Sequence, residues 1–141
     1  MGHVIHSTYR SALVAIALLL SACATTPAPR LENQDWQLIA WSLSSERASD
    51  FTITARFADG GVSGRSAVNT YRATVALGPG NALAVGPMAM TRMAGPEPAL
   101  RAEKAYLELL GDARSWQVAD GRLRLLDAGG NESLVFAATA D

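Results

Sequence analysis

The sequence predicts a single α+β domain, built as an antiparallel, strongly curved sheet or small barrel of about seven to eight strands with one α-helix. Short segments in which apolar and polar residues alternate are separated by glycine-rich turns, which is typical of antiparallel strands. One longer stretch instead carries apolar residues at helical spacing. The 119 residues that follow residue 22 of this 141-residue chain suffice for one domain and leave no room for a second.

Alternation of apolar and polar residues marks the strands in the first half of this domain. Residues 51–57 have the period of a half-buried strand and are followed by a turn at residues 58–61. The alternation returns at residues 71–77, and a turn at residues 78–81 separates this segment from Leu83 and Val85. We therefore expect the second and third of these strands to form a hairpin.

The C-terminal part of the sequence predicts a three-stranded meander. Residues 115–118 and 122–126 flank the pair Asp120-Gly121, which is a strong signal for a two-residue hairpin turn. A third strand at residues 134–136 follows a turn at residues 129–131.

Between the two groups of strands, residues 97–110 are predicted to form the helix. Pro96 and Pro98 lie near its start and Gly111 lies just past its expected end. Its apolar stripe, which we interpret as a core contact, consists of Ala99, Ala102, Tyr106, Leu109 and Leu110.

The N-terminal segment has the order of an export signal. A polar stretch with one firmly basic residue, Arg10, precedes an apolar run at residues 12–20 that is too short to span a bilayer. Leu20-Ser-Ala-Cys23 then resembles the bacterial lipobox, and Cys23 is the only cysteine of the chain. We expect cleavage after residue 22, a lipid on Cys23, and a flexible tether over residues 23–34 with Pro27 and Pro29. The alternative is an ordinary secretory signal with an incidental cysteine.

Several classes of function are excluded or disfavoured by the composition. Both histidines, His3 and His6, lie in the expected leader, so the mature chain lacks the residues of a Ser-His-Asp triad, a Cys-His pair or a usual zinc site. Lys104, the only lysine, lies in the predicted helix, which disfavours a Ser-Lys pair. With 12 basic and 13 acidic residues, the chain shows no excess charge for binding nucleic acid. No cofactor and no metal is predicted.

The domain resembles the META, or HslJ-like, family. The segments that carry this resemblance are Trp36-Gln-Leu38 in the first strand, Gly64 to Tyr71 in place of the family's G-x-x-G-C-N-x-Y, residues 88–95 in place of its A-x-T-x-M-A-C, Glu103 and the pair Leu109-Leu110 in the helix, and the strands at residues 123–125 and 134–136. The motif positions are Trp36, Leu38, Gly64, Asn69, Tyr71, Thr91, Arg92, Met93 and Glu103. The domain assigned in this way runs over residues 35–138.

The resemblance implies a non-enzymatic envelope lipoprotein that acts through protein contacts in envelope maintenance or the stress response. Its membrane partner would be reached through the lipid on Cys23, an envelope protein is a further expected partner, and the domain is expected to be monomeric. Ala24, in place of an inner-membrane retention signal, favours a periplasm-facing position at the outer membrane. The alternatives are a binding module with an apolar or lipid-like ligand inside the curved sheet, and an unrecognised hydrolase.

The resemblance also leads to expectations for six individual positions within these segments. Val68 and Gly95 stand where many members of the family have two cysteines, so the resemblance implies that these two positions are neighbours in space. For Asn69 and Thr91 we favour local hydrogen bonding to the backbone over a role in ligand binding. Arg92 is expected at the surface, beside a buried Met93.

Overall fold

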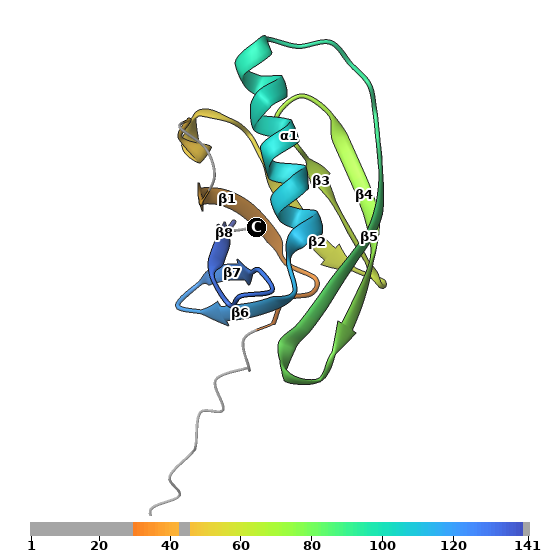
Figure 1. Cartoon of the computed structure of the whole chain (residues 1–141), viewed down its shortest axis with the longest axis vertical. Coiled ribbons are helices and arrows are strands. Elements are labelled where there is room, and N and C mark those ends of the chain that lie inside the picture. The colour runs from red at the N-terminus through yellow and green to blue at the C-terminus, as the bar shows by residue number, and fades with distance from the viewer. Residues whose placement is uncertain (1–29, 43–45, 140–141) are drawn as a thin grey trace, which may run out of the picture.

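The computed structural model describes residues 30–42 and 46–139, and its eight strands close into an antiparallel barrel in which each strand pairs with the next and the last pairs with the first. Figure 1 shows the helix labelled α1 lying along one side of this barrel. The strands are β1 (Asp35–Trp41), β2 (Thr54–Ala58), β3 (Gly61–Arg65), β4 (Thr70–Gly78), β5 (Ala82–Met90), β6 (Ser115–Ala119), β7 (Arg122–Leu126) and β8 (Glu132–Ala138). The helix α1 runs over Glu97–Asp112, and two 3-10 turns occupy Ala48–Asp50 and Pro79–Asn81. The predicted α+β class and strand number are confirmed.

Two of the hairpins turn on an Asp-Gly pair. The sequence predicts the hairpin at Asp120-Gly121, but at residues 58–61 it predicts only a turn and misses the short strand β3 that follows. Asp59 and Gly60 have φ values of 52° and 71°, and Asp120 and Gly121 have φ values of 53° and 68°. Two consecutive residues with positive φ define a type I′ turn, whose twist matches that of the flanking strands. These turns fix the register of β2 with β3 and of β6 with β7.

The barrel has one weak seam, between β5 and β6. These strands pair only at Ala82 and Ser115, with one further backbone bond from the Leu83 amide to the carbonyl of Arg114. The chain between them forms α1, which lies beside β5 across the rest of this gap (Figure 1). The helix therefore closes the barrel where strand pairing does not.

Side chains fill the barrel interior. Tyr106 of α1 is fully buried and meets the rings of Tyr71 and Phe136 edge to face, at centroid distances of 5.5 and 6.3 Å. The rest of the interior is supplied by Trp36, Leu38, Ile53, Ala55, Phe57, Val62, Leu83, Leu110, Leu123, Leu125 and Leu134. Four hollows of about 380–650 Å³ at the surface of the described residues are open to solvent.

Two boundaries and the burial of two helix residues differ from the expected ones. The helix continues through Gly111, and it ends where the amide of the buried Ala113 bonds to the carbonyl of Leu110. The strand expected from residue 51 begins at Thr54, because the segment before it makes only an isolated bridge. Within the expected stripe, Ala99 is only half-buried and Glu103 is buried instead.

The folded part of the chain begins before the predicted boundary at residue 35. Leu31 is only 2% exposed, and its carbonyl accepts a hydrogen bond of 3.0 Å from the indole nitrogen of Trp36. The amide of Asn33 bonds to the carbonyl of Phe57 at 2.8 Å. Residues 31–33 thus belong to the barrel and not to the tether, while the predicted leader, Cys23 and the tether up to residue 29 lie outside the described residues.

Candidate functional site

Several motif positions meet at one corner of the barrel, where the connection between β3 and β4 approaches the end of β5 and the second turn of α1. We call the side chains of Ser66, Asn69, Thr91 and Glu103 the corner network. Three of its members are almost fully buried, with Glu103 5% and Asn69 2% exposed. Since these residues lie on three separate segments, their hydrogen bonds tie the helix to the barrel.

The carboxylate of Glu103 is the acceptor at the centre of the corner network. One oxygen accepts from the hydroxyl of Ser66 at 2.7 Å and from the amide of Asn69 at 2.8 Å, and the other accepts from the side-chain Nδ2 of Asn69 at 2.8 Å. Burial raises the pKa of this carboxyl, but the hydrogen bonds from Ser66 and Asn69 outweigh it and hold the pKa below the ordinary value of 4.5. Glu103 is therefore ionised at neutral pH.

Asn69 connects the carboxylate of Glu103 to the exit of β5. Its Oδ1 accepts from the hydroxyl of Thr91 at 2.8 Å and from the backbone amide of Met93 at 2.7 Å. The hydroxyl of Thr91 in turn accepts from the backbone amide of Thr70 at 3.2 Å. Both ends of the Asn69 amide are thus used within the protein, as expected for a residue that satisfies local backbone groups.

A pair of tyrosines lies between the corner network and the core. The hydroxyl of Tyr71 donates to the carbonyl of Thr54 at 2.9 Å, so the hydroxyl of Tyr106, 2.6 Å away, donates to it. Burial, offset in part by the hydrogen bond to Tyr106, raises the pKa of Tyr71 above its ordinary value of 10.0. The carbonyl of Thr54 also explains Gly64, because a Cβ at this position would clash with that oxygen. Tyr71 and Gly64 therefore serve packing.

The remaining motif positions divide between the core and the surface. Trp36 and Leu38 are buried in the core. Arg92 is exposed, as expected. The expectation of a buried Met93 is wrong: its side chain is 56% exposed, because its backbone amide, and not its side chain, is held by Asn69.

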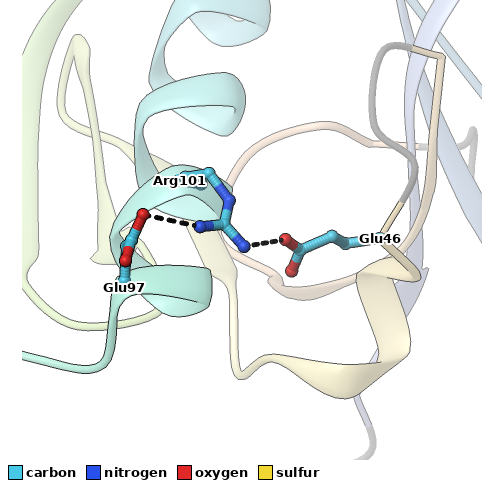
Figure 2. A network of polar contacts seen from close by, with 3 residues as sticks. All are labelled: Glu46, Glu97 and Arg101. Carbon is cyan, nitrogen blue, oxygen red and sulfur yellow. Dashed lines mark hydrogen bonds and ion pairs between the residues drawn. The ribbon is translucent and has the colours of Figure 1, made fainter.

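A second polar contact holds the first turn of α1 at the surface. Figure 2 shows Arg101 between two carboxylates, with nitrogen–oxygen distances of 3.1 Å to Glu97 and 3.0 Å to Glu46. Exposed ion pairs stabilise a fold by only about 0–1 kcal/mol. The contact therefore supports the helix start without replacing the buried bonds of Glu103.

Val68 and Gly95 lie side by side, as the resemblance implies. A Cβ built on Gly95 would be 3.4 Å from the Cβ of Val68 and 2.7 Å from one of its methyl groups. The valine thus fills the space that a side chain at position 95 would need. Gly95 does not have the positive φ that would penalise a side chain.

The side chains of the corner network hydrogen-bond to one another and to the backbone. Among the described residues, no buried side-chain nitrogen or oxygen is without a hydrogen-bond partner. In the same part of the chain, no three His, Cys, Asp or Glu side chains are grouped as metal ligands would be. The hydrogen bonds of the corner network therefore act as a clamp between α1 and the barrel. Ser66, which donates to Glu103, was not predicted from the sequence, because a serine between Gly64 and Asn69 is equally typical of a turn.

We predict that Glu103→Gln destabilises the domain by about 2–3 kcal/mol at neutral pH, because the new amide group faces donors that would lose their charged acceptor. The control, Glu108→Gln, changes an exposed residue of the same helix and should cost less than about 0.5 kcal/mol. Urea unfolding measures both. Equal effects of the two changes would contradict the clamp.

The pH dependence of the effect of Glu103→Gln tests whether the carboxyl group of Glu103 is ionised. Because its pKa is lowered on folding, its ionisation adds stability that is complete above pH 4.5 and is lost as the pH falls through the folded-state value. The free-energy gap between wild type and Glu103→Gln should therefore narrow from neutral pH to about pH 3. Asp127, whose pKa is also lowered by hydrogen bonds from Asn131, contributes equally to both proteins. A gap that does not change with pH would contradict an ionised Glu103.

We predict that Val68→Cys combined with Gly95→Cys forms a disulfide in air. The Cβ separation of 3.4 Å is close to the range of about 3.5–4.5 Å found in disulfides. Closing this loop should add about 3 kcal/mol by chain entropy, less the packing that Val68 gives up. Thiol titration of the chain from residue 24 onward, with each single cysteine variant as control, decides the question. Two free thiols after oxidation would contradict the geometry.

The comparisons with known proteins agree with this fold. The solved structures similar to the chain include a protein from Burkholderia xenovorans determined by NMR, with 27% identity, a TM-score of 0.63, and coverage of 79% of this chain and 85% of that one. A crystal structure of a DUF4847 family protein from Bacteroides vulgatus has 15% identity, a TM-score of 0.57, and coverage of 79% and 96%, and shows the fold alone. No curated protein matches the chain. The META domain model matches residues 29–140, so this chain belongs to the META domain family.

Proposed function

We propose that this META domain protein is a bacterial envelope lipoprotein that acts through protein contacts and not through catalysis. The observation that carries the proposal is Cys23, the only cysteine, which follows Leu20-Ser-Ala at the end of an apolar run. An unpaired thiol in an exported protein would otherwise be exposed to oxidation without a disulfide partner. A lipid on Cys23 accounts for both its position and its isolation.

The non-enzymatic part of the proposal rests on how the motif residues are used. Asn69, Thr91 and Glu103 spend their hydrogen-bonding groups on one another and on the backbone. Beyond His6 the sequence contains no histidine to act as a general base. The buried hydroxyl of Tyr71 has a raised pKa and donates to a backbone carbonyl, which makes it unsuited to proton transfer.

Contact with another protein fits the barrel better than an enclosed ligand does. The interior is occupied by side chains, so an apolar ligand would have to displace them. Apolar side chains instead line a groove of about 380 Å³ between the end of β5 and α1, where Met90 and Leu100 are exposed and Leu107 is half-buried. Such a groove is a surface that a partner protein can cover.

The proposed position is the periplasmic side of the outer membrane. Ala24 after the lipidated cysteine is the feature that favours this membrane. None of the helices in residues 30–42 and 46–139 is long and apolar enough to cross a bilayer. A monomeric domain held on a short tether could reach envelope proteins there, in maintenance of the envelope or in its stress response.

We predict that Cys23→Ser leaves the precursor uncleaved and without lipid, because the lipoprotein peptidase acts only before a lipid-modified cysteine. Mass spectrometry of the N-terminus in wild type and variant measures this directly. A change at Ser21 to another small residue, Ser21→Ala, is the matched control and should be processed normally. An unmodified N-terminus in wild type, with cleavage unaffected by Cys23→Ser, would contradict the anchor.

The absence of catalysis has its own test, independent of the anchor. The purified chain from residue 24 onward should turn over none of a panel of ester, peptide and phosphate substrates. Reproducible turnover that is lost on replacing an Asp or Glu would overturn the non-enzymatic proposal and leave the lipid anchor unaffected.

A further inference from the structure

We propose that the outer face of strands β2 to β5 is a basic surface that docks on anionic lipid headgroups. The inference rests on the proposed lipid anchor, which would hold the domain next to a membrane. We call the side chains of Arg56, Arg65 and Arg72 the arginine face. In this proposal, their contacts with the headgroups determine how the domain is oriented on the bilayer.

The strand register brings the three arginines together. Arg56 of β2 pairs with Ser63 of β3, and Ser63 pairs with Arg72 of β4, so both arginines flank the same serine. With neighbouring strands about 4.8 Å apart, the backbones of Arg56 and Arg72 lie about 10 Å from each other. Arg65 follows two residues after Ser63 on β3 and is exposed on the same side. All three arginine side chains therefore extend outward from the same patch of the sheet.

Charges are separated along the chain, although the whole chain carries a net charge of only −1. Residues 54–96 contain four arginines and a single acidic residue, Asp59. Arg56 forms an ion pair of 3.0 Å with Asp35, and Arg65 donates to a backbone carbonyl. Counting charges over the whole sequence hides this basic side, which is why the composition gave no sign of it.

The shape of the arginine face suits a flat, charged partner. Two shallow hollows of about 410 and 650 Å³ lie on it and share Ser63, Arg72 and Ala89 as lining residues. The small side chain of Ser63 lies between Arg56 and Arg72. The long arginine side chains can therefore extend beyond it to a common plane in front of the sheet. Asp59 lines the larger hollow at its edge. Open hollows of this kind fit a layer of headgroups better than one enclosed anion.

The start of the folded chain lies next to the arginine face. Glu32 bridges to Phe57 of β2 in a parallel sense, and Asp35 pairs with Arg56 itself. The seven Cα–Cα steps from Cys23 to Arg30 span at most about 25 Å. A lipid on Cys23 would thus hold the arginine face within reach of the headgroups.

The test couples the chain from Cys23 onward, whose buried core lies within residues 31–136, through its single thiol to a maleimide lipid in nanodiscs. The nanodiscs contain phosphatidylcholine alone or with phosphatidylglycerol, plus a gadolinium-bearing lipid that broadens nearby amide signals in NMR spectra. With phosphatidylglycerol, we expect selective broadening at Ser63, Thr70, Arg72 and Ala89, which weakens as salt is added. With phosphatidylcholine alone, we expect no selectivity.

Variants make the test specific to the arginine face. Each basic residue at an anionic surface strengthens binding about fivefold, so Arg65→Gln with Arg72→Gln should shift the docking equilibrium about 25-fold away from the membrane. Arg56→Gln with Arg72→Gln should do the same without touching the hydrogen bond of Arg65. The control, Arg47→Gln with Arg122→Gln, removes the same charge elsewhere and should leave docking unchanged.

Three outcomes would overturn the proposal. They are broadening without preference for the arginine face, equal losses in the control, and shifts at the same amides caused by inorganic phosphate without selective broadening by the membrane, which would indicate a site for a free anion. Because the anchor is supplied chemically, none of these outcomes depends on whether cells attach a lipid to Cys23. Failure of the docking and failure of the anchor are therefore distinguishable.

Discussion

The buried carboxylate of Glu103 is the constraint on which the barrel depends. A charge removed from water is costly unless donors surround it, and those donors must be held at fixed positions. Here the donors come from the connection between β3 and β4, and Asn69 carries the constraint on to the end of β5. One ionised group therefore sets the relative positions of three segments that are far apart in sequence.

The position of this clamp explains why the helix is part of the barrel. Strands β5 and β6 meet at a single residue pair, so pairing alone would leave that side open. Tyr106 covers the interior from the helix, through its ring contacts with Tyr71 and Phe136, and Glu103 lies one turn before it. Apolar packing and the polar clamp thus act on neighbouring turns of α1, and removing one would loosen the other.

If the side chains of the corner network are used in closing the barrel, the proposed function would depend on other side chains. Cys23, the exposed Met90 and Leu100, and the three arginines of the arginine face are not members of the corner network, although Glu103 also lines the groove and Thr91 lines one hollow of the arginine face. The proposed role is that of a stable scaffold that is held at a membrane and presents its surfaces to other molecules.

Much of this fold could be predicted from local sequence, since the Asp-Gly turns and the alternating strands depend on residues close together in the chain. The burial of Glu103 could not be predicted in this way. Helical periodicity places Glu103 next to the apolar stripe, but it cannot show that Ser66 and Asn69 lie opposite and donate hydrogen bonds to the carboxylate. Nor could the start of the barrel at Leu31, since its burial depends on Trp36 and on the distant Phe57. The family resemblance identified Val68 and Gly95 as neighbours, which no local pattern would show.

The most direct test of the clamp is a double-mutant cycle on Asn69→Ala and Glu103→Ala, with the free energy of unfolding measured at neutral pH. Residues that share a buried hydrogen-bond network interact by about 0.5–3 kcal/mol. Asn69→Ala removes the bond from the side-chain Nδ2 to the ionised carboxylate and keeps the bond from the backbone amide, and one bond to a charged group should place this pair at about 1.5 kcal/mol or more. The double variant should then be much less destabilised than the sum of the single variants. Additive effects within about 0.5 kcal/mol would contradict the account, because Glu103 and Asn69 would then stabilise the barrel independently.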